Sequence, residues 1–361
     1  MTDIRGVYRG RRVLVTGHTG FKGSWLSLWL QELGADVTGV ALAPPTSPNH
    51  WDVLKLAIHA DHRLDIRDAV GLEQIVHASR PEVIFHLAAQ PLVRRSYVDP
   101  LDTWTTNVVG TANVLNACRS ARGLRGVVVV TSDKCYENQG PGRRYRETDR
   151  LGGHDPYSAS KAAAEIVAAS YRDAYFGDQG AALVATARAG NVIGGGDWAE
   201  DRLIPDLVRA HGAGASLTVR SPNATRPWQH VLECTSGYLQ LGARLFEGQR
   251  EFASAWNFGP AEEGARTVAD VLNSLDKHWP QLRWHVGNHD SVVEAQWLGL
   301  DISKARTLLE WHPVWSLDEA LAATASWYRR FLVDGIVESH RQLAEYVAAF
   351  QSQSSVVSLA E

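Results

Sequence analysis

The chain contains only three cysteines and one methionine among its 361 residues. Cys118, Cys135 and Cys234 are too few and too scattered for a disulfide framework or a CxxC metal site. The 14 histidines include no HExxH pair, so we expect no structural metal. No run reaches the ~18 apolar residues that cross a bilayer, and the polar N-terminal segment lacks the pattern of a secretory signal. These absences predict a cytoplasmic protein.

An excess of either charge is also missing. Lys and Arg total 36, Asp and Glu total 40, and the net charge is -4. This balance argues against a nucleic-acid or membrane-surface binder, which normally carries a basic excess. Apolar residues make up 45% of the chain, which is enough for sizeable cores. At roughly 150 residues per domain the length suggests two domains.

Apolar strands alternate with helical patterns over the first half of the chain. After the first strand, Phe21, Trp25, Leu28 and Trp29 recur at helical spacing, and Gly34 is the expected stop. The predicted strands are 13–15, 37–42, 64–66, 83–87, 127–130 and 182–189, and further helices are predicted over 70–79, 103–122 and 157–175. Such alternation predicts an α/β protein with a Rossmann-type, doubly wound parallel sheet.

The pattern becomes irregular and richer in proline after about residue 190. Short helices are predicted over 204–211, 232–246, 267–279, 303–310 and 317–333. We therefore expect a dinucleotide-binding domain over 1–190 and a smaller, mixed α/β substrate domain over 191–350, with segments exchanged between them. Residues 351–361 are expected to form a disordered tail.

A glycine-rich turn lies between the first strand and the first helix. Gly17, Gly20 and Gly23 form a GxxGxxG pattern, which lets backbone approach a pyrophosphate at a helix N-terminus. The second strand ends without the Asp or Glu that often binds the adenosine ribose, so the residues leave NAD and NADP open. Asp65 and Ile66 follow the third strand and could bracket an adenine.

Tyr157 and Lys161 stand four residues apart on a predicted helix, which puts both side chains on one face. A tyrosine normally titrates near ~10. A nearby lysine and a positively charged nicotinamide would lower the pKa of the phenol and make it a usable base at neutral pH.

A hydroxyl, a carboxylate and an amine follow the valine-rich strand, at Ser132, Asp133 and Lys134. Open α/β sheets place ligand-facing residues at this end of a strand. The three groups could bond a sugar hydroxyl, donate a proton and remove one; a polar turn is the plainer alternative.

These motifs together resemble the extended short-chain dehydrogenase/reductase family, within it the nucleotide-sugar 4,6-dehydratases. The resemblance covers about residues 10 to 335 and is carried by GHTGFKG (17–23), HLAAQ (86–90), NVVGT (107–111), TSDKCY (131–136), YSASK (157–161), ARAGNVIGGGDW (187–198), RLIPD (202–206) and RPWQHV (226–231). Three departures from the usual motifs of this group make the chain most similar to the branch that acts on CDP-glucose. They are AAQPLVRRSY where relatives have AAESHVDRS, Lys134 in place of a glutamate, and APPTSPN at 43–49.

The resemblance implies a tightly bound NAD that is regenerated in each turnover. Tyr157 would take the proton from the sugar O4 while hydride leaves C4. A base would then remove the C5 proton while an acid protonates the C6 hydroxyl, water would leave, and hydride would return to C6. Asp133 would be the acid, Ser132 would bond the sugar near O4, and Lys134 occupies the place of the C5 base. The product would be a 4-keto-6-deoxy sugar, usually destined for surface polysaccharide.

The lysine at position 134 raises a chemical question. It must be neutral to accept a proton, so its pKa must be depressed. Otherwise it stabilises the enolate as a cation, and another group or water removes the proton.

The remaining roles that the resemblance implies fall on two sets of positions. Cofactor-contacting positions are Gly17, Thr19, Gly20, Phe21, Lys22, Gly23, Asp65, Ile66, Leu87, Ala88, Ala89, Thr106, Tyr157 and Lys161. Substrate-contacting positions are Gln90, Ser132, Asn191, Arg202, Leu203, Ile204, Arg226 and Asn257. Arg226 is the expected diphosphate ligand, because guanidinium binds phosphate oxygens bidentately. Relatives pair through two long helices per subunit, here at about 100–120 and 157–176, which implies a homodimer.

Three alternatives stay open at this point. A nucleotide-sugar 4-epimerase needs Tyr157 and Lys161 but no acid–base pair for elimination. A 4,6-dehydratase for another nucleotide sugar fits the same motifs. A dinucleotide-sensing regulator of the same fold typically loses the Tyr/Lys pair, which this chain keeps.

Overall fold

A seven-stranded sheet forms the centre of the molecule. The computed structural model describes residues 4–140, 142–178, 180–261, 265–287 and 297–358. The strands are ordered β11-β6-β5-β4-β1-β2-β3 and all pair in parallel. Their bounds are β1 Arg12–Thr16, β2 Asp36–Ala41, β3 Ala60–Arg63, β4 Val83–His86, β5 Gly126–Val130, β6 Leu183–Ala189 and β11 Ala255–Phe258. The strand order reverses between β1 and β4, which is where open α/β sheets bind ligands.

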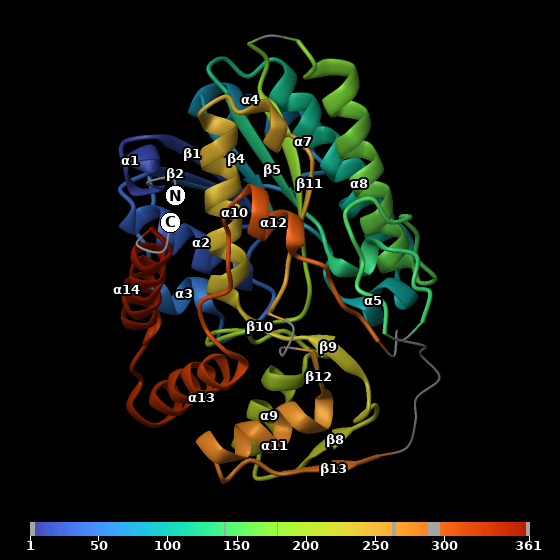
Figure 1. Ribbon diagram of the computed structural model, residues 1–361, viewed down its shortest axis with the longest axis vertical. Coiled ribbons are helices and arrows are strands. Elements are labelled where there is room, and N and C mark those ends of the chain that lie inside the picture. The colour runs from blue at the N-terminus through green and yellow to red at the C-terminus, as the bar shows by residue number, and fades with distance from the viewer. Residues whose placement is uncertain (1–3, 141, 179, 262–264, 288–296, 359–361) are drawn as a thin grey trace.

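Helices cover both faces of the sheet (Figure 1), which explains why the central strands are continuous apolar runs. All five residues of β5 are buried, as expected for a strand covered on both sides. One side carries α1 Ile4–Tyr8, α2 Phe21–Glu32 and α10 Val231–Phe246; the other carries α4 Ala69–Ser79, α7 Gly110–Arg119 and α8 Pro156–Tyr175. The predicted Rossmann-type fold is therefore present.

The start of α8 is fixed by local sequence. Asp155 caps the helix by accepting from the Ser158 backbone N–H, and Ser158 completes a capping box. Pro156 follows at the first helical position, where its missing N–H costs nothing. The helix that carries Tyr157 and Lys161 thus begins at a defined residue.

A smaller part lies beyond the carboxyl ends of the strands (Figure 1). It contains α9 Leu203–Gly212, α11 Val268–His278, α13 Leu317–Asp334 and three two-stranded pairs: β7 Val192–Ile193 with β10 Gln229–His230, β8 Leu217–Val219 with β13 Trp284–Val286, and β9 Thr225–Pro227 with β12 Ala265–Thr267. In contrast, α10 and β11 return to the main sheet and α12 Ser303–Leu308 packs on β11. The chain therefore crosses between the two parts more than once after residue 190.

A long C-terminal helix, α14 Ser339–Ser358, packs against α2. The expected tail at 351–361 begins inside this helix, and residues 359–361 lie outside the described part. The predicted strand at 64–66 is also displaced, since β3 ends at Arg63.

The remaining elements are short. They are α3 His50–Leu54, α5 Val93–Val98, α6 Pro100–Trp104, a π-helical turn at Thr105–Val109 and 3₁₀ turns at Asp133–Cys135 and Arg250–Phe252. Within the described ranges, no helix combines the length and the apolar character needed to cross a bilayer.

Candidate active site

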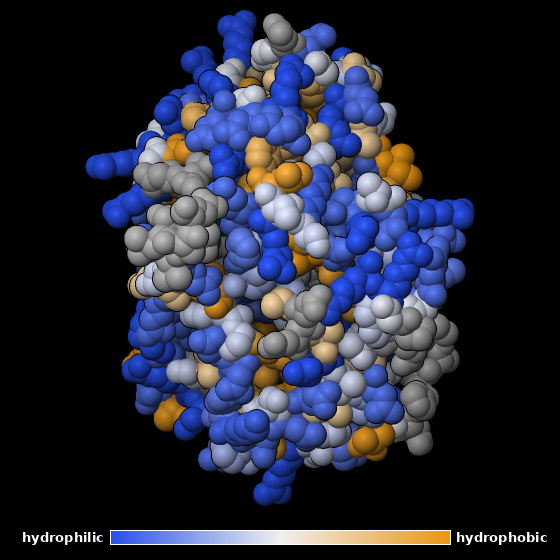
Figure 2. Space-filling model, viewed as in Figure 1, coloured by the Kyte–Doolittle hydropathy of each residue, from blue (hydrophilic) through white to orange (hydrophobic). Residues whose placement is uncertain are grey.

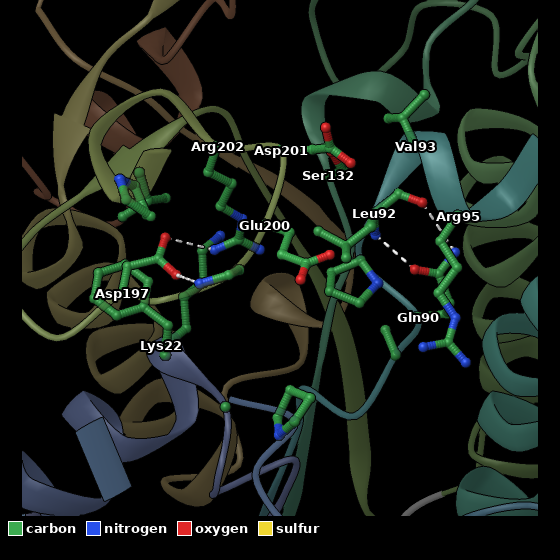
Figure 3. Close-up of a pocket in the computed structure, with 18 of the residues that line it drawn as sticks. Lys22, Gln90, Leu92, Val93, Arg95, Ser132, Asp197, Glu200, Asp201 and Arg202 are labelled. Atoms are coloured by element: carbon green, nitrogen blue, oxygen red, sulfur yellow. Dashed lines mark hydrogen bonds and ion pairs between the residues drawn. The ribbon is translucent and has the colours of Figure 1, made fainter. Parts of the chain in front are cut away.

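A cavity of about 960 Å³ lies between the carboxyl ends of the strands and the smaller part of the molecule. Segment 90–95 borders it on one side and segment 197–202 on the other (Figure 3). The volume is at the upper end of ligand pockets in proteins. The space-filling view shows a largely hydrophilic face, with hydrophobic residues in small groups (Figure 2).

The glycine turn lines one end of this cavity. Gly17 has φ +76° and passes so close to β4 that a Cβ there would lie 2.6 Å from the Ala88 nitrogen. A Cβ on Gly23 would lie 2.1 Å from the Gly17 carbonyl oxygen. At the helix start, Gly20 offers no side-chain cap to α2, and residues 20–23 line the cavity, so the first backbone N–H groups of the helix are suited to bind an anion there. This geometry fits the pyrophosphate of a dinucleotide.

Two polar residues beside the turn are already held by the protein. Thr19 Oγ1 donates to the Leu42 carbonyl at 2.9 Å. The Asp65 carboxylate accepts from Arg67 at 2.6 to 3.0 Å, and hydrogen bonds from Arg67 hold the pKa of this carboxyl below its usual value. Both residues line the cavity, but Asp65 acts there as one half of an ion pair.

Tyr157 and Lys161 reach the cavity from one face of α8. Burial raises the pKa of Tyr157 to about 12, although a hydrogen bond with Ser132 works in the opposite direction. Burial, followed by the charge of Lys22, lowers the pKa of Lys161 to about 8. The protein's own groups therefore do not supply the lowered tyrosine pKa expected from the sequence. That expectation also included a positively charged nicotinamide, whose charge would have to lower the pKa of Tyr157.

The segment after β5 brings three further groups to the same place. Ser132 Oγ donates to Asp133 Oδ1 at 2.9 Å and accepts from the Lys134 backbone N–H at 3.2 Å. The Lys134 ammonium lies 5.9 Å from the centre of the Tyr157 ring. Burial raises the pKa of Asp133 against the opposing charge of Lys134. A carboxyl with a raised pKa next to a cavity is suited to donate a proton.

The second oxygen of Asp133 strengthens this assignment. Asp133 Oδ2 is buried and, among the described residues, has no hydrogen-bond partner. A buried carboxylate oxygen without a partner is costly, so this atom is available to a ligand in the cavity.

The smaller part supplies most of the predicted substrate positions. Asn191, Arg202, Leu203, Ile204 and Arg226 all line the cavity. Arg202 Nη1 pairs with Asp197 at 2.8 Å (Figure 3). Arg226 is buried, and its guanidinium also donates to the Thr225 carbonyl at 3.0 Å.

Gln90 lines the cavity with its side chain engaged elsewhere. Its amide donates to Thr103 and to the Leu92 carbonyl and accepts from the Leu92 N–H. Gln90 therefore shapes the loop at the cavity wall and keeps little capacity to bond a substrate.

Asn257 lies apart from the other predicted substrate positions. It is fully buried and is absent from the cavity lining. Its side chain accepts from the Tyr136 hydroxyl at 2.7 Å and donates to the carbonyls of Tyr145 and Asp301. Asn257 thus joins β11 to neighbouring loops, and its contact with the substrate stays a prediction of the sequence.

Three charged residues were missed by the sequence analysis. Arg94 on α5 and Arg220 after β8 approach the same oxygen of Asp201, at 3.4 and 3.6 Å. All three line the cavity, so this bridge connects the two sides of its mouth. The only sequence signal was the arginine pair in AAQPLVRRSY, and it did not reveal the partner.

The described residues show no cluster of three or more His, Cys, Asp or Glu side chains that could hold a metal ion.

Comparisons with known proteins agree with this geometry. A model of the NAD dependent epimerase/dehydratase family matches residues 13–255. The chain is 43% identical to the CDP-glucose 4,6-dehydratase of Salmonella typhimurium over 353 residues, which cover 96% of this chain and 98% of that protein. It is 30% identical to the UDP-glucose 4-epimerase of Mycolicibacterium smegmatis over 328 residues, covering 88% and 98%.

Solved structures support the fold. MoeE5 in complex with UDP-glucose and NAD aligns with a TM-score of 0.74 and 28% identity, over 89% of this chain and 99% of that chain. The epimerase Mth375 from Methanothermobacter thermautotrophicus aligns with a TM-score of 0.80 and 24% identity, over 91% and 95%. The predicted fold class is confirmed.

Proposed function

Because this chain belongs to the NAD-dependent epimerase/dehydratase family, we propose that it is a CDP-glucose 4,6-dehydratase. It converts CDP-glucose to CDP-4-keto-6-deoxyglucose and water. The observation that carries this proposal is the placement of Asp133 and Lys134 beside Tyr157 in one cavity. An elimination needs such an acid–base pair, whereas an epimerisation at C4 does not. The 43% identity to the Salmonella relative supports the choice of substrate.

The glycine turn and Lys161 are the residues that would hold NAD. The turn offers backbone N–H groups at the start of α2 to the pyrophosphate, and Lys161 would bond the nicotinamide ribose. When bound, NAD accepts a hydride from the sugar and later returns it. The cavity extends past the end of β2 to Asp65 and Ile66, which leaves room for the adenosine.

Tyr157 acts as the base at the sugar O4. Its burial disfavours the phenolate, so the proton leaves only when positive charge is close. Arg202 supplies part of this charge, and the positive nicotinamide of bound NAD would add to it; Lys161 lies one helical turn away on the same helix face. Ser132 bonds the sugar near O4 and holds the phenol in line.

Asp133 and Lys134 carry the elimination. Asp133 donates its proton to the departing C6 hydroxyl, which its raised pKa favours. Lys134 faces the ring of Tyr157 and lies where the C5 proton is removed. It accepts the C5 proton on its Nζ, and the ammonium that forms stabilises the enolate.

The smaller part binds the nucleotide. Arg226 and Arg202 supply guanidinium groups to the cavity and bind the diphosphate. Arg202 is held in place by Asp197, so its fork is oriented before the substrate arrives.

Incubation with CDP-glucose and NAD tests the proposal, with UDP-glucose, dTDP-glucose and GDP-mannose in parallel. Loss of one water from CDP-glucose, followed by mass, is expected to exceed the loss from the other three. If none of the sugars loses water, the dehydratase assignment is wrong. Formation of a C4 epimer instead would establish the epimerase alternative.

We also propose that two copies pair through α5–α8. These helices pack side by side and carry several exposed apolar side chains. This outer apolar patch consists of Val98, Leu101, Trp104, Val109, Ile166 and Tyr175. Exposed apolar area of this kind marks protein interfaces, and a self-complementary face would give a twofold dimer. A cytoplasmic location stays a prediction of the sequence.

A further inference from the structure

The catalytic segment Ser132–Lys134 is tied at both ends to one buried ion pair. At its start, Thr131 Oγ1 donates to Glu165 Oε1. At its end, Arg188 Nη1 donates to the Tyr136 hydroxyl at 2.7 Å. The two partners, Glu165 and Arg188, are themselves bonded to each other. The residues on both sides of the catalytic segment are therefore bonded to the same ion pair.

The ion pair is well shielded from water. Arg188 Nη2 lies 2.7 Å from Glu165 Oε2, and the side chains are only 4% and 3% exposed. Burial opposes ionisation of Glu165, but Arg188 and hydrogen bonds from Thr131 and Thr186 outweigh it and hold the pKa of the carboxyl below its usual value. The pair is thus charged, dry and held by several bonds, which makes its geometry rigid.

The same pair is anchored on the elements that carry the other catalytic groups. Glu165 lies on α8, four residues after Lys161 and eight after Tyr157, so the three side chains share one helix face. Arg188 lies on β6, next to β5 in the sheet. Neither Glu165 nor Arg188 lines the cavity, so both act on the chemistry through other residues: they hold Thr131 and Tyr136, and the charge of Glu165 also raises the pKa of Lys161.

We propose that Glu165 and Arg188 are positioning residues that fix Asp133 and Lys134 relative to Tyr157. This inference rests on the proposed dehydratase function. The helix face of Tyr157 and Lys161 is fixed independently by twenty helical residues and a capping box. In contrast, Asp133–Cys135 forms only a 3₁₀ turn, so its position depends on contacts at its two ends. Loss of the pair should therefore impair elimination more than oxidation at C4.

Tyr136→Phe is the mildest test, because it removes only the hydroxyl that Arg188 and Asn257 contact. Glu165→Gln removes the charge of the pair while keeping the shape of the side chain. In Tyr136→Phe, C4 oxidation, measured as NADH absorbance after mixing with CDP-glucose, should stay within about threefold of wild type. Glu165→Gln also removes a charge that raises the pKa of Lys161, so part of any loss of oxidation in that variant belongs to Lys161. Solvent deuterium uptake at C5 and water loss should fall by roughly 10- to 100-fold, since misplacing a reacting group by about 1 Å has effects of this order.

Glu338→Gln is the matched control. Glu338 is also a buried carboxylate, paired with Arg330 and Arg341, but it does not line the cavity. Its replacement removes a buried charge without touching the catalytic segment. We expect the ratio of oxidation to elimination to stay at the wild-type value.

The outcomes distinguish a failure of the positioning role from a failure of the proposed function. Equal loss of oxidation and elimination in Tyr136→Phe, or no loss of either, overturns the positioning role, even if Glu165→Gln fails to fold. A wild-type protein that releases no water from CDP-glucose overturns the proposed function instead. Accumulated NADH together with suppressed C5 exchange supports both.

Discussion

Asp133 is the residue on which the proposed reaction most depends. It is buried, its pKa is raised by burial, and one oxygen lacks a partner among the described residues. Asp133→Asn keeps the shape of the side chain but cannot supply the proton. We expect dehydration of CDP-glucose to fall by about 100-fold or more, in line with general acid catalysis, while oxidation at C4 persists. Product mass and NADH absorbance measure the two steps.

Asp318→Asn is a suitable control, because this aspartate is largely exposed and lies on α13. It should leave both steps unchanged. An Asp133→Asn enzyme with the wild-type overall rate would contradict the assignment of Asp133 as the general acid.

The ammonium of Lys161 should destabilise the protein when no nucleotide is bound. Its pKa is lowered by burial from 10.5 to about 8, so the folded chain binds fewer protons than the unfolded chain between these values. Stability therefore rises with pH from about 8 to 10.5, and the full penalty, about 3 kcal/mol, is present below pH 8. Lys161→Met should raise the free energy of unfolding at pH 7 and abolish activity.

Urea unfolding of nucleotide-stripped protein at two pH values measures this effect. The advantage of Lys161→Met over wild type should shrink between pH 7 and pH 9.5. A constant difference across this interval would show that the penalty does not come from protonation of the lysine.

Among the elements, α14 illustrates how a remote helix supports the fold. Tyr346 is fully buried, lies edge-on to Trp29 and Trp315, and donates to Glu233 at 2.8 Å. Tyr346→Ala should lower the free energy of unfolding by about 3–5 kcal/mol, because it leaves a large cavity. Tyr346→Phe should cost only about 1 kcal/mol, the usual value of one hydrogen bond. Urea unfolding at neutral pH distinguishes the two, and equal effects would contradict the packing argument.

The sequence predicted the elements that have strong local patterns. Strand β5, helix α2 and helix α8 fall within a residue or two of their expected bounds, because apolar runs, a glycine turn and an N-cap mark them. β11 was not predicted, because a segment of only four residues forms a strand by pairing with β6 and has no strong pattern of its own. α14 was also missed, although Leu343, Tyr346 and Phe350 have helical spacing.

The candidate site was predictable where its functional residues lie close together in the sequence. Tyr157 and Lys161 are neighbours on one helix, and Ser132–Lys134 is continuous, so local patterns could group them. The bridge between Arg94, Asp201 and Arg220 joins three distant segments, and no pattern within any one segment encodes it. The hydrogen bonds of the Asn257 amide to Tyr136 and Tyr145 also join distant segments, so the sequence did not indicate them.

At the scale of the whole molecule, the outer apolar patch on α5–α8 predicts the oligomeric state. Val98 is 86% exposed and Ile166 is 59% exposed, an arrangement that a second copy would cover. Ile166→Arg should shift the protein from dimer to monomer in sedimentation experiments. Val333→Arg, at an 81% exposed position on α13, should leave the mass unchanged. A wild-type monomer at micromolar concentration would refute the pairing.

The late return of β11 to the sheet has a consequence for synthesis. All seven residues of β6 are buried in the finished molecule, yet the neighbour that covers its outer edge follows only at Ala255–Phe258. While the ribosome makes the intervening residues, β6 presents an unpaired apolar edge of the kind that recruits other chains. A fragment that ends at residue 190 should therefore aggregate in a sedimentation assay in which the full chain stays in solution.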